Sequence, residues 1–396
     1  MDDLGVEIKG DSLKDKKILL GITGGIAATQ SVKLLRELRR YQAEITVIMT
    51  DAAQKVITPL AISWAGNCKV ITNWEYGMSG LENYDAILVA PTTRNTMAKI
   101  ANGILDSPLL MAISAAKTNN TPVVLIPSMH NSMANDQKTT DLCAIIIDLG
   151  FKIIWGDFEE QKLKQPSEIS IVANFSNYVN SYLPNRKKIV ITLGSTISYI
   201  DDIRYIKNSS SGKTGFQIAS KLHREGHEIT IVSGQTEYSL NFNLPLVIKT
   251  DTPEEMLLEL KALTKCSIDV WIHAAAVLDY VIPEPVEGKI ASLQGDLNVQ
   301  LKEGAKHISE LKEMCDGAVR IGFKLESGIK QKDLVHRAHA QIQTAGMTAT
   351  IANRMEDYGK EGMPRGWLVD SHGAHFILET ENDMCNAIRS VIENNR

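Results

Sequence analysis

The stretch KILLGITGGIAATQSVKLLRELRRYQAEITVIMT, residues 17–50, decides the fold class of this chain. It opens with an apolar run, KILLGI (17–22), turns through two adjacent glycines, and continues as SVKLLRELRR (31–40), whose apolar residues recur at helical spacing. A second apolar run, ITVIMT (45–50), follows. A strand, an amphipathic helix and another strand in this order predict one βαβ unit with parallel strands.

The same alternation continues up to about residue 155. Further strands are expected in YDAILVAP (84–91), TPVVLIP (121–127) and FKIIW (151–155). Helical stretches, NTMAKIANGI (95–104) and KTTDLCAIIIDLG (138–150), separate them. Strands that alternate with helices predict an α/β fold with a doubly wound parallel sheet.

The pattern then starts again. KKIVITLGST (187–196) reads as a strand, NSSSGKTG (208–215) as a polar turn, FQIASKLHREG (216–226) as a helix and EITIVSG (228–234) as the next strand. Later strands are expected in DVWIHAAAV, AVRIGFKLE and TATIAN, with a final pair in GWLVDSHGAHFILET. A chain of 396 residues is too long for one ordinary core, so two α/β domains are expected, 1–183 and 184–396.

Composition restricts the classes of protein that remain. The net charge of −5 offers no basic surface for nucleic acid, and no apolar run approaches the roughly 18 residues of a membrane helix. The amino terminus lacks the basic-then-apolar order of a secretory signal, and the five cysteines form no CxxC pair. A cytoplasmic protein with no membrane or nucleic-acid partner is therefore expected.

Four ordered motifs mark the first half. GITGGIAA (21–28) lies where a strand passes into a helix, which suits a phosphate group, and MTDAAQKVITPL, APTTRNTMAKIANGILDSPLL (90–110) and PSMHNSM (127–133) follow. Together they resemble the FMN-dependent cysteine decarboxylases, a flavodoxin-like family that includes phosphopantothenoylcysteine decarboxylase. The resemblance implies FMN binding by these residues: Gly24, Gly25, Ile26, Ala27, Thr50, Ala90, Thr92, Thr93 and Asn95.

Three departures from this family concern the decarboxylation chemistry. The family's catalytic histidine is replaced by Gly77 or Ser79, and His130 stands where the family has the asparagine of PxMNxxM. The family's cysteine-bearing flap corresponds here to WGDFEEQKLKQPSEIS (155–170), which has no cysteine. A positioned acid and a closed flap are what this reaction needs, so the first half is expected to have lost its activity. FMN binding itself stays open.

Four motifs in the second half resemble phosphopantothenate-cysteine ligase. ITLGSTISYIDDIRYIKNSSSGKTG (191–215) matches the signature ITxGPTxExIDxVRxIxNxSSGxxG. HAAAVLDY (273–280) followed by Lys289, GFKLES (322–327) and IAN (351–353) come in the family's order. The resemblance implies a Rossmann-like ligase domain that joins cysteine to phosphopantothenate through an acyl-nucleotide, with Mg²⁺ and either CTP or ATP.

By this resemblance, individual residues receive roles. Asn208 and Lys289 are the expected catalytic residues, for the first and the cysteine-dependent step. The expected substrate-binding residues are Arg204, Ser210, Ser211 and Gly212, and the expected nucleotide-binding residues are His273, Ala274, Ala275, Asp279, Lys289, Phe323 and Arg337. Departures at Ser195, Ser198, Gln341 and the turn 304–306 predict a reduced affinity for the triphosphate.

Three hypotheses follow for the whole chain. The first is an active ligase with an inactive flavin half, the second a bifunctional enzyme whose decarboxylase uses His130, and the third a non-catalytic partner of an active decarboxylase. Retention of Asn208 and Lys289 favours the first over the third. By resemblance a homo-oligomer is expected, with trimeric flavin domains and dimeric ligase domains.

Overall fold

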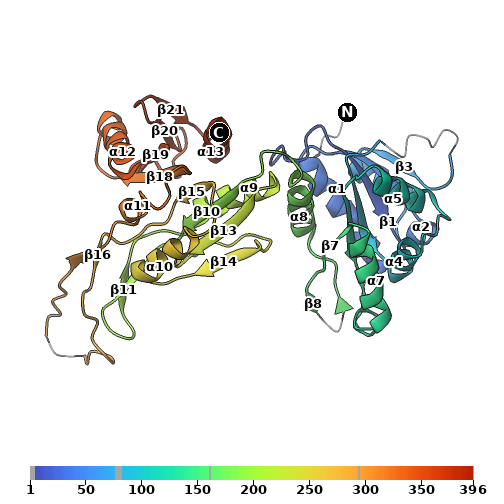
Figure 1. The fold of residues 1–396 in the computed structure, drawn as a ribbon, viewed down its shortest axis with the longest axis horizontal. Coiled ribbons are helices and arrows are strands. Elements are labelled where there is room, and N and C mark those ends of the chain that lie inside the picture. Colours follow the sequence, from blue (N-terminus) through green and yellow to red (C-terminus); the bar gives the residue numbers. More distant parts are fainter. Residues whose placement is uncertain (1–4, 76–82, 160–161, 293–294, 396) are drawn as a thin grey trace. The chain divides into compact units, whose positions relative to one another are not determined.

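The computed structural model describes residues 5–75, 83–159, 162–292 and 295–395 (Figure 1). The chain divides into two compact units, the first running to Tyr182 and including Arg224–Gly226, the second made of the remaining residues. Each unit is built around its own mostly parallel sheet. The predicted pair of doubly wound α/β domains is thus confirmed.

The sheet of the first unit has six strands in the order β3-β2-β1-β4-β5-β7, and all its pairings are parallel. Without the short edge strand β3, this is the 2-1-3-4-5 order of flavodoxin-like sheets. The strands are β1 (Lys17–Ile22), β2 (Glu44–Met49), β3 (Lys69–Ile71), β4 (Ala86–Thr92), β5 (Val123–Pro127) and β7 (Lys152–Ile153).

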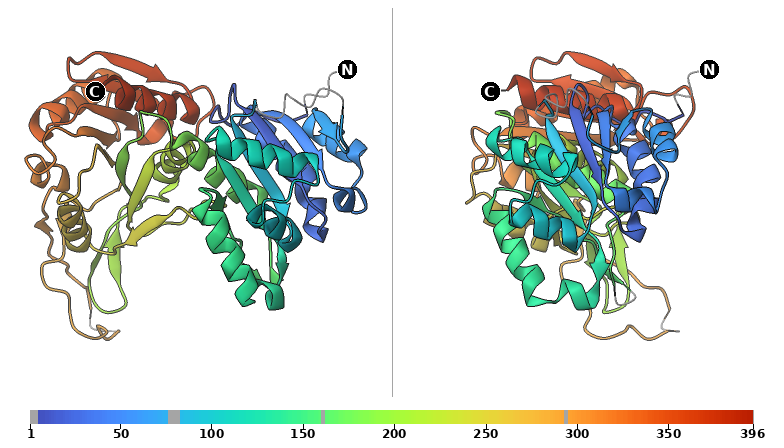
Figure 2. Two further views of the ribbon diagram at one scale, coloured as in Figure 1. Left: turned by 45° about the vertical axis from the view of Figure 1, so that its right-hand side comes forward. Right: turned by 90° about the vertical axis from the view of Figure 1, so that its right-hand side faces the viewer.

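Helices cover both faces of this sheet (Figure 2). They are η1 (Ile26–Gln30), α1 (Ser31–Arg40), α2 (Asp51–Gln54), α3 (Pro59–Gly66), α4 (Arg94–Ala101), α5 (Pro108–Thr118), α6 (Asn131–Ala134), α7 (Gln137–Asp148) and α8 (Glu168–Asn180). Alternate residues of β1 point to opposite sides, so Leu20 joins the core under α1 and α8 while Leu19 joins the core under α4 and α5. A strand buried on both faces explains the uninterrupted apolar run of KILLGI.

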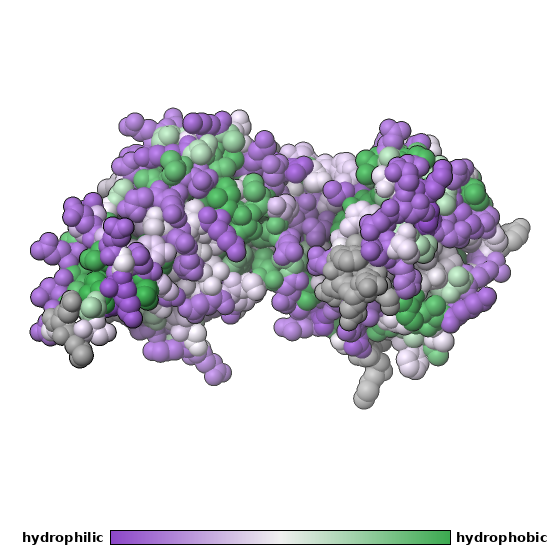
Figure 3. Space-filling model, turned by 90° about the horizontal axis from the view of Figure 1, so that it is seen from below, coloured by the Kyte–Doolittle hydropathy of each residue, from purple (hydrophilic) through white to green (hydrophobic). Residues whose placement is uncertain are grey.

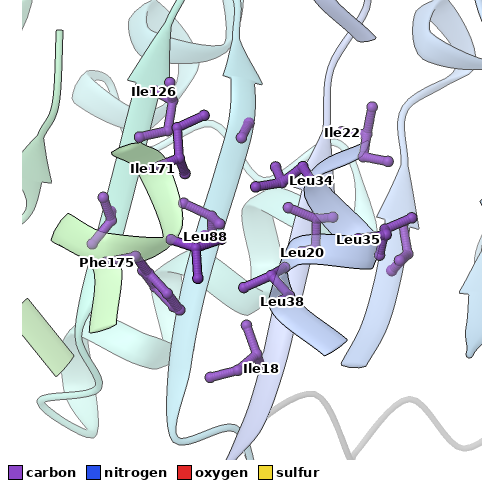
Figure 4. Close-up of a cluster of buried hydrophobic side chains, with 14 of the residues drawn as sticks. Ile18, Leu20, Ile22, Leu34, Leu35, Leu38, Leu88, Ile126, Ile171 and Phe175 are labelled. Carbon is purple, nitrogen blue, oxygen red and sulfur yellow. The ribbon is translucent and has the colours of Figure 1, made fainter. Parts of the chain in front are cut away.

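Figure 4 shows the core on the α1 and α8 side. Leu34 and Leu38 of α1, four residues apart, project towards β1, and Phe175 of α8 packs beside β4. All three side chains are fully buried. The apolar residues that recur at helical spacing in α1 therefore form the face that packs on the sheet.

A separate three-stranded sheet follows β5. Its strands, in the order β6-β9-β8, are β6 (Met129–His130), β8 (Phe158–Glu159) and β9 (Lys162–Leu163), and both pairings are antiparallel. The backbone of His130 pairs with that of Lys162. The segment that corresponds to the family's flap thus folds back onto the PSMHNSM segment.

The sheet of the second unit has eight strands in the order β14-β13-β10-β15-β18-β19-β20-β21. The first six are parallel in the 3-2-1-4-5-6 Rossmann order, and β20 and β21 extend the sheet as antiparallel strands. They are β10 (Lys188–Leu193), β13 (Glu228–Ser233), β14 (Leu246–Lys249), β15 (Val270–His273), β18 (Val319–Glu326), β19 (Ala349–Arg354), β20 (Gly366–Asp370) and β21 (His375–Leu378).

The helices of this unit connect these strands. They are α9 (Lys213–Arg224), α10 (Pro253–Leu263), α11 (His307–Glu310), α12 (Gln331–Ala345), the 3₁₀ turn η3 (Met355–Asp357) and α13 (Glu381–Asn394). A Thr–Glu capping box opens α10, and a corresponding Thr–Asp box at Thr380 and Asp383 opens α13. Both helices therefore begin where their capping residues predict.

Two extended connections project from the second sheet (Figure 1). One carries the hairpin of β11 (Ile197–Tyr199) and β12 (Tyr205–Lys207), and the other runs between β16 (Tyr280–Val281) and β17 (Lys302–Glu303). Asp201 and Arg204 join them, because Asp201 Oδ2 accepts from the Ile290 N–H at 3.1 Å and Arg204 Nη2 donates to the Ile290 carbonyl at 2.6 Å. The two connections form one arm.

The surface mixes hydrophilic residues with hydrophobic patches, as on the face that Figure 3 shows. Within the described parts of the chain, no helix combines the length and the apolar character needed to cross a membrane.

Candidate functional site

In the first unit, the glycine turn lies at the carboxyl end of β1, beside the ends of β2 and β4. Thr23 joins the turn to β4, since its hydroxyl donates to the Pro91 carbonyl at 2.8 Å and accepts from the Thr93 N–H at 2.9 Å. A Cβ on Gly24 would lie 2.2 Å from the Ala52 Cβ. Only glycine permits this close approach of the turn to α2.

The residues predicted to hold FMN surround this turn in part. Thr50 and Thr93 each cap a helix, accepting from Ala53 N and Thr96 N at 3.3 Å, so both helices begin near the turn. Thr92 is different, because it is fully buried and its hydroxyl bonds Val89 O and Ile126 N within the sheet. Its side chain supports β4 and is not open to a ligand.

The turn fits a phosphate group. A Cβ on Gly25 would have only Thr93 Cγ2, at 3.7 Å, as a neighbour, so the space beside Gly25 is open. The N–H groups of Ile26 and Ala27 are the first of η1, and the first N–H groups of any helix have no acceptor within that helix. They can therefore donate to an anion. These residues are therefore suited to the phosphate of FMN.

The residues predicted for decarboxylation chemistry are less well placed. Gly77 and Ser79 lie outside the described residues. His130 is exposed and is the N-cap residue of α6, but its side chain makes no capping hydrogen bond. The flap is present as the β8–β9 hairpin, but the segment from Trp155 to Ser170 contains no cysteine.

In the second unit, one cavity of about 720 Å³ opens at the carboxyl ends of β10, β15, β18 and β19. This is the edge at which doubly wound sheets bind ligands, and the volume is in the range of small-molecule sites. Nine of the residues predicted from the ligase resemblance line it: Asn208, Ser210, Ser211, Gly212, His273, Ala274, Ala275, Asp279 and Phe323.

Asn208 is held by the loop after β15. Its Nδ2 donates to the carbonyl oxygens of Ala276 and Val277 at 3.4 and 3.1 Å. Those carbonyls can only accept, so the amide nitrogen faces the loop. The loop is held in turn by Thr192, whose hydroxyl accepts from the Ala275 N–H at 3.2 Å. The wall of the cavity is thus fixed from β10.

The serine-rich turn leads directly into α9. Gly212 has φ +77°, and a Cβ there would lie 2.7 Å from Thr236 Cγ2. The Ser210 and Ser211 hydroxyls accept from the N–H groups of Gly212 and Lys213 at 3.4 Å. The turn therefore presents the amino-terminal end of a helix to the cavity, as an anion site requires.

Two buried histidines also line the cavity. Burial, helped by the charge of Arg320 and by His307, lowers the pKa of His273 to about 3. Burial likewise lowers the pKa of His307, despite the opposing Pro253 carbonyl and nearby glutamates. Both rings are therefore neutral at pH 7. The ring of His273 stacks on Trp271 with centroids 6.5 Å apart.

Three residues predicted for this site do not line the cavity. Arg204 lies on the arm, with its Nε 3.2 Å from the Asp201 carboxylate. Arg337 lies on α12 and forms an ion pair at 2.8 Å with Glu326, the last residue of β18. Lys289 is exposed on the arm, where its neighbour Gly288 bonds the Asp202 backbone and carboxylate. The structure therefore separates these three cations from the rest of the predicted site.

Burial opposes ionisation of Asp201, but hydrogen bonds from three backbone N–H groups and the charge of Arg204 outweigh it and lower the pKa of Asp201. This carboxylate is fully buried and joins the two parts of the arm. Asp201 therefore stabilises the arm, and its ion pair with Arg204 occupies part of that guanidinium.

Sequence reasoning missed several residues of the cavity wall. They are Thr214, Glu237, Lys306, His307, Asn353, Tyr358 and Arg365. Thr214 and Asn353 stand inside motifs of the ligase family, and Lys306 stands in the turn 304–306, so these three could have been found there. Arg365 precedes β20 with no recognisable pattern around it. Among the described residues, no group of three or more His, Cys, Asp or Glu side chains could hold a metal ion.

Comparisons with known proteins match both units. The family model "DNA/pantothenate metabolism flavoprotein C-terminal domain" matches residues 185–390, and the model "Flavoprotein" matches residues 7–197. A protein of Thermococcus kodakarensis named "Coenzyme A biosynthesis bifunctional protein CoaBC" is 35% identical over 89% of this chain and 89% of its own length. A protein of the same name from Borreliella burgdorferi is 33% identical over 93% of this chain and 96% of its own. A solved "DNA/Pantothenate Metabolism Flavoprotein" of Streptococcus pneumoniae, 22% identical, covers 53% of this chain and 100% of its own with a TM-score of 0.47.

Proposed function

Since this chain belongs to the family of coenzyme A biosynthesis bifunctional proteins, we propose that its second unit is an active phosphopantothenate-cysteine ligase and that its first unit has lost decarboxylase activity. The observation that carries the ligase half is the gathering of nine motif residues around one cavity. They come from three separate stretches of sequence, and a scaffold without chemistry has no need of such a site.

In the proposed reaction, the carboxylate of phosphopantothenate attacks the α-phosphate of the nucleotide, which gives an acyl-nucleotide and pyrophosphate. The amine of cysteine then displaces the nucleotide and forms an amide. Negative charge develops in both steps, so positioned donors lower both barriers. Asn208 and the turn from Ser210 to Gly212 orient the substrate, and Ala274, Ala275 and Phe323 enclose the nucleotide.

Mg²⁺ usually binds through one or two carboxylates together with substrate phosphates. Asp279 is the acidic residue among the cavity residues predicted to bind the nucleotide, and its carboxylate suits that role. When bound, the ion would neutralise charge on the triphosphate. We propose CTP or ATP as the nucleotide.

Lys289 can support the cysteine-dependent second step only if the arm places its side chain at a cavity. It is anchored by its neighbours Gly288 and Ile290, which bond Asp202 and Asp201, while its side chain is exposed. Family ligase domains are dimeric, so the same arm in a homo-oligomer could meet the cavity of its own or of a second chain. A homo-oligomer with trimeric flavin units and dimeric ligase units is proposed on this basis.

The loss of decarboxylase activity rests on missing chemistry, not on a missing fold. The phosphate turn suits FMN, which when bound would supply the oxidation of the substrate thiol. The chain's own contribution would be an acid near the flavin and a flap that excludes water. His130 is the one histidine in the motifs of the first half, and the flap hairpin has no cysteine.

A second candidate is a bifunctional enzyme in which His130 serves as the acid. The names of both relatives favour it, because each is called bifunctional. A third candidate, a non-catalytic partner of an active decarboxylase, has no observation in its favour beyond the altered motifs of the first unit.

One experiment separates these candidates. The full chain is incubated with Mg²⁺, CTP or ATP, phosphopantothenate and cysteine, and pyrophosphate is measured. We expect release only when phosphopantothenate is present, because its carboxylate is the nucleotide's acceptor. In a second assay the substrate is phosphopantothenoylcysteine, FMN is added, and the release of carbon dioxide is measured. No release is expected.

Pyrophosphate release without phosphopantothenate, or none with either nucleotide, would contradict the ligase proposal. Carbon dioxide release that His130→Ala abolishes would replace the inactive first unit by the bifunctional candidate.

A further inference from the structure

Arg365 directly precedes β20 and lines the cavity, 151 positions along the chain from Thr214. Its Nη2 donates to the Thr214 hydroxyl at 2.8 Å, and its Nε donates to Glu381 Oε1 at 2.7 Å. The guanidinium lies 4.9 Å from the centroid of the Tyr358 ring. With 9% of its side chain exposed, Arg365 is held in one orientation by three neighbours.

One nitrogen of this guanidinium is left over. Nη1 of Arg365 is buried and has no hydrogen-bond partner among the described residues, and the same is true of Glu381 Oε2. Native proteins pair nearly all buried polar atoms, and an unpaired charged one is especially costly. Because Arg365 lines the cavity, its positive charge favours an anion bound there.

The surroundings of Arg365 carry further positive charge. Thr214 lies in the first turn of α9 and Glu381 is the first residue of α13, so two helix amino-terminal ends meet at this arginine. Helix dipoles disfavour a cation at that end and favour an anion. The first turn of α13 carries two carboxylates, Glu381, which bonds Arg365, and Asp383, which belongs to the capping box. The first turn of α9 carries none, so its positive helix end is not offset by an acidic residue of its own.

Arg365 orients the Thr214 hydroxyl so that it can donate to a ligand. Its hydroxyl oxygen accepts from Arg365, so its own hydrogen points elsewhere and is free to be donated. The N–H groups of Thr214 and Gly215, in the first turn of α9, also lack intrahelical acceptors. Together they form a set of donors of the kind that binds a phosphoryl group.

We propose that Arg365 and Thr214 form a phosphoryl-binding subsite at the start of α9, with Thr214 in contact with the ligand and Arg365 as the residue that orients it and supplies charge. The identity of the ligand rests on the proposed ligase function, which offers two sources of the same chemistry, the phosphate of phosphopantothenate and the phosphates of the nucleotide. Phosphoryl binding itself does not require turnover.

The test is direct binding to the full chain, measured by titration calorimetry with matched ligand pairs. Phosphopantothenate is compared with pantothenate, and CTP and ATP are compared with cytidine and adenosine. We expect Arg365→Gln to weaken binding of one phosphorylated ligand by about 10- to 100-fold and to leave its unphosphorylated partner unchanged. The pair that responds identifies the source of the phosphate.

Two variants distinguish a binding role from a merely structural ion pair. Glu381→Gln removes the same ion pair but leaves the guanidinium's charge unopposed, so it should tighten binding of that phosphorylated ligand severalfold. Arg354→Gln removes a comparable arginine, which bonds Asp357 at 2.6 Å and stacks on Trp367 but does not line the cavity, and it should leave the preference for phosphorylated ligands unchanged.

A structural ion pair predicts that Arg365→Gln and Glu381→Gln change binding in the same direction, or change stability alone. Either result would overturn the subsite. Because binding is measured apart from turnover, a chain that releases no pyrophosphate but shows the expected shifts would contradict the ligase function and still support the subsite. Thr214→Val, which keeps the shape of the side chain, should lower the affinity in the same assay.

Discussion

Substituting Gly212 by alanine should damage both the stability and the chemistry of the second unit. Its φ of +77° is in the left-handed region, where an L-residue with a Cβ costs about 1–2 kcal/mol. The new Cβ would also lie 2.7 Å from Thr236 Cγ2, closer than side chains pack. Relief of that contact requires movement of the turn or of Thr236 and adds about 1–3 kcal/mol.

A matched control separates these two contributions. Gly317 has φ +80°, but a Cβ there would have no neighbour within 4 Å. Gly317→Ala should therefore show the conformational cost alone, about 1–2 kcal/mol, while Gly212→Ala should cost about 2–5 kcal/mol. The free energy of unfolding from urea titrations measures both, and the difference between the two variants reports the contact with Thr236.

The same pair tests the site. A displacement of about 1 Å in a positioning group costs on the order of 100-fold in rate, so Gly212→Ala should lose pyrophosphate release while Gly317→Ala keeps it. Equal losses of stability in the two variants, together with normal pyrophosphate release by Gly212→Ala, would refute this reasoning.

Two further predictions concern the chemical steps and pH. Lys289→Gln should block cysteine incorporation more than pyrophosphate release, whereas Asn208→Ala should impair the first step by about 100-fold or let the acyl-nucleotide escape; small, equal effects would show that the two roles are not divided in this way. Because burial lowers the pKa of His273 to about 3, the unfolded chain binds a proton there that the folded one does not, so stability falls as the pH drops below about 6.5. His273→Gln should remove about 1.4 kcal/mol per pH unit of that loss, and urea unfolding at pH 7.5 and 5.0 would refute the buried neutral ring if wild type and variant lost equal stability.

The sequence alone determined the architecture, because the relevant information is local. From Ile18 onward β1 is apolar because it is buried on both faces, and Leu34 and Leu38 recur at helical spacing because α1 is buried on one. Nine of the residues predicted from the ligase motifs also line one cavity. Asn208 and Ala275 follow β10 and β15, and the carboxyl ends of adjacent parallel strands share one edge of a sheet.

The positions of the remaining residues depend on the tertiary structure. Lys289 and Arg204 belong to the ligase motifs, yet the arm holds them away from the cavity wall, and no periodicity in the sequence encodes where an extended connection points. Arg365 shows the converse. It has no motif, and it meets Thr214 only because β20 adds to the sheet as an antiparallel strand beside β19, which brings its first residues to the cavity edge. Contacts of this kind depend on strand order and direction, which residue spacing along the chain does not record.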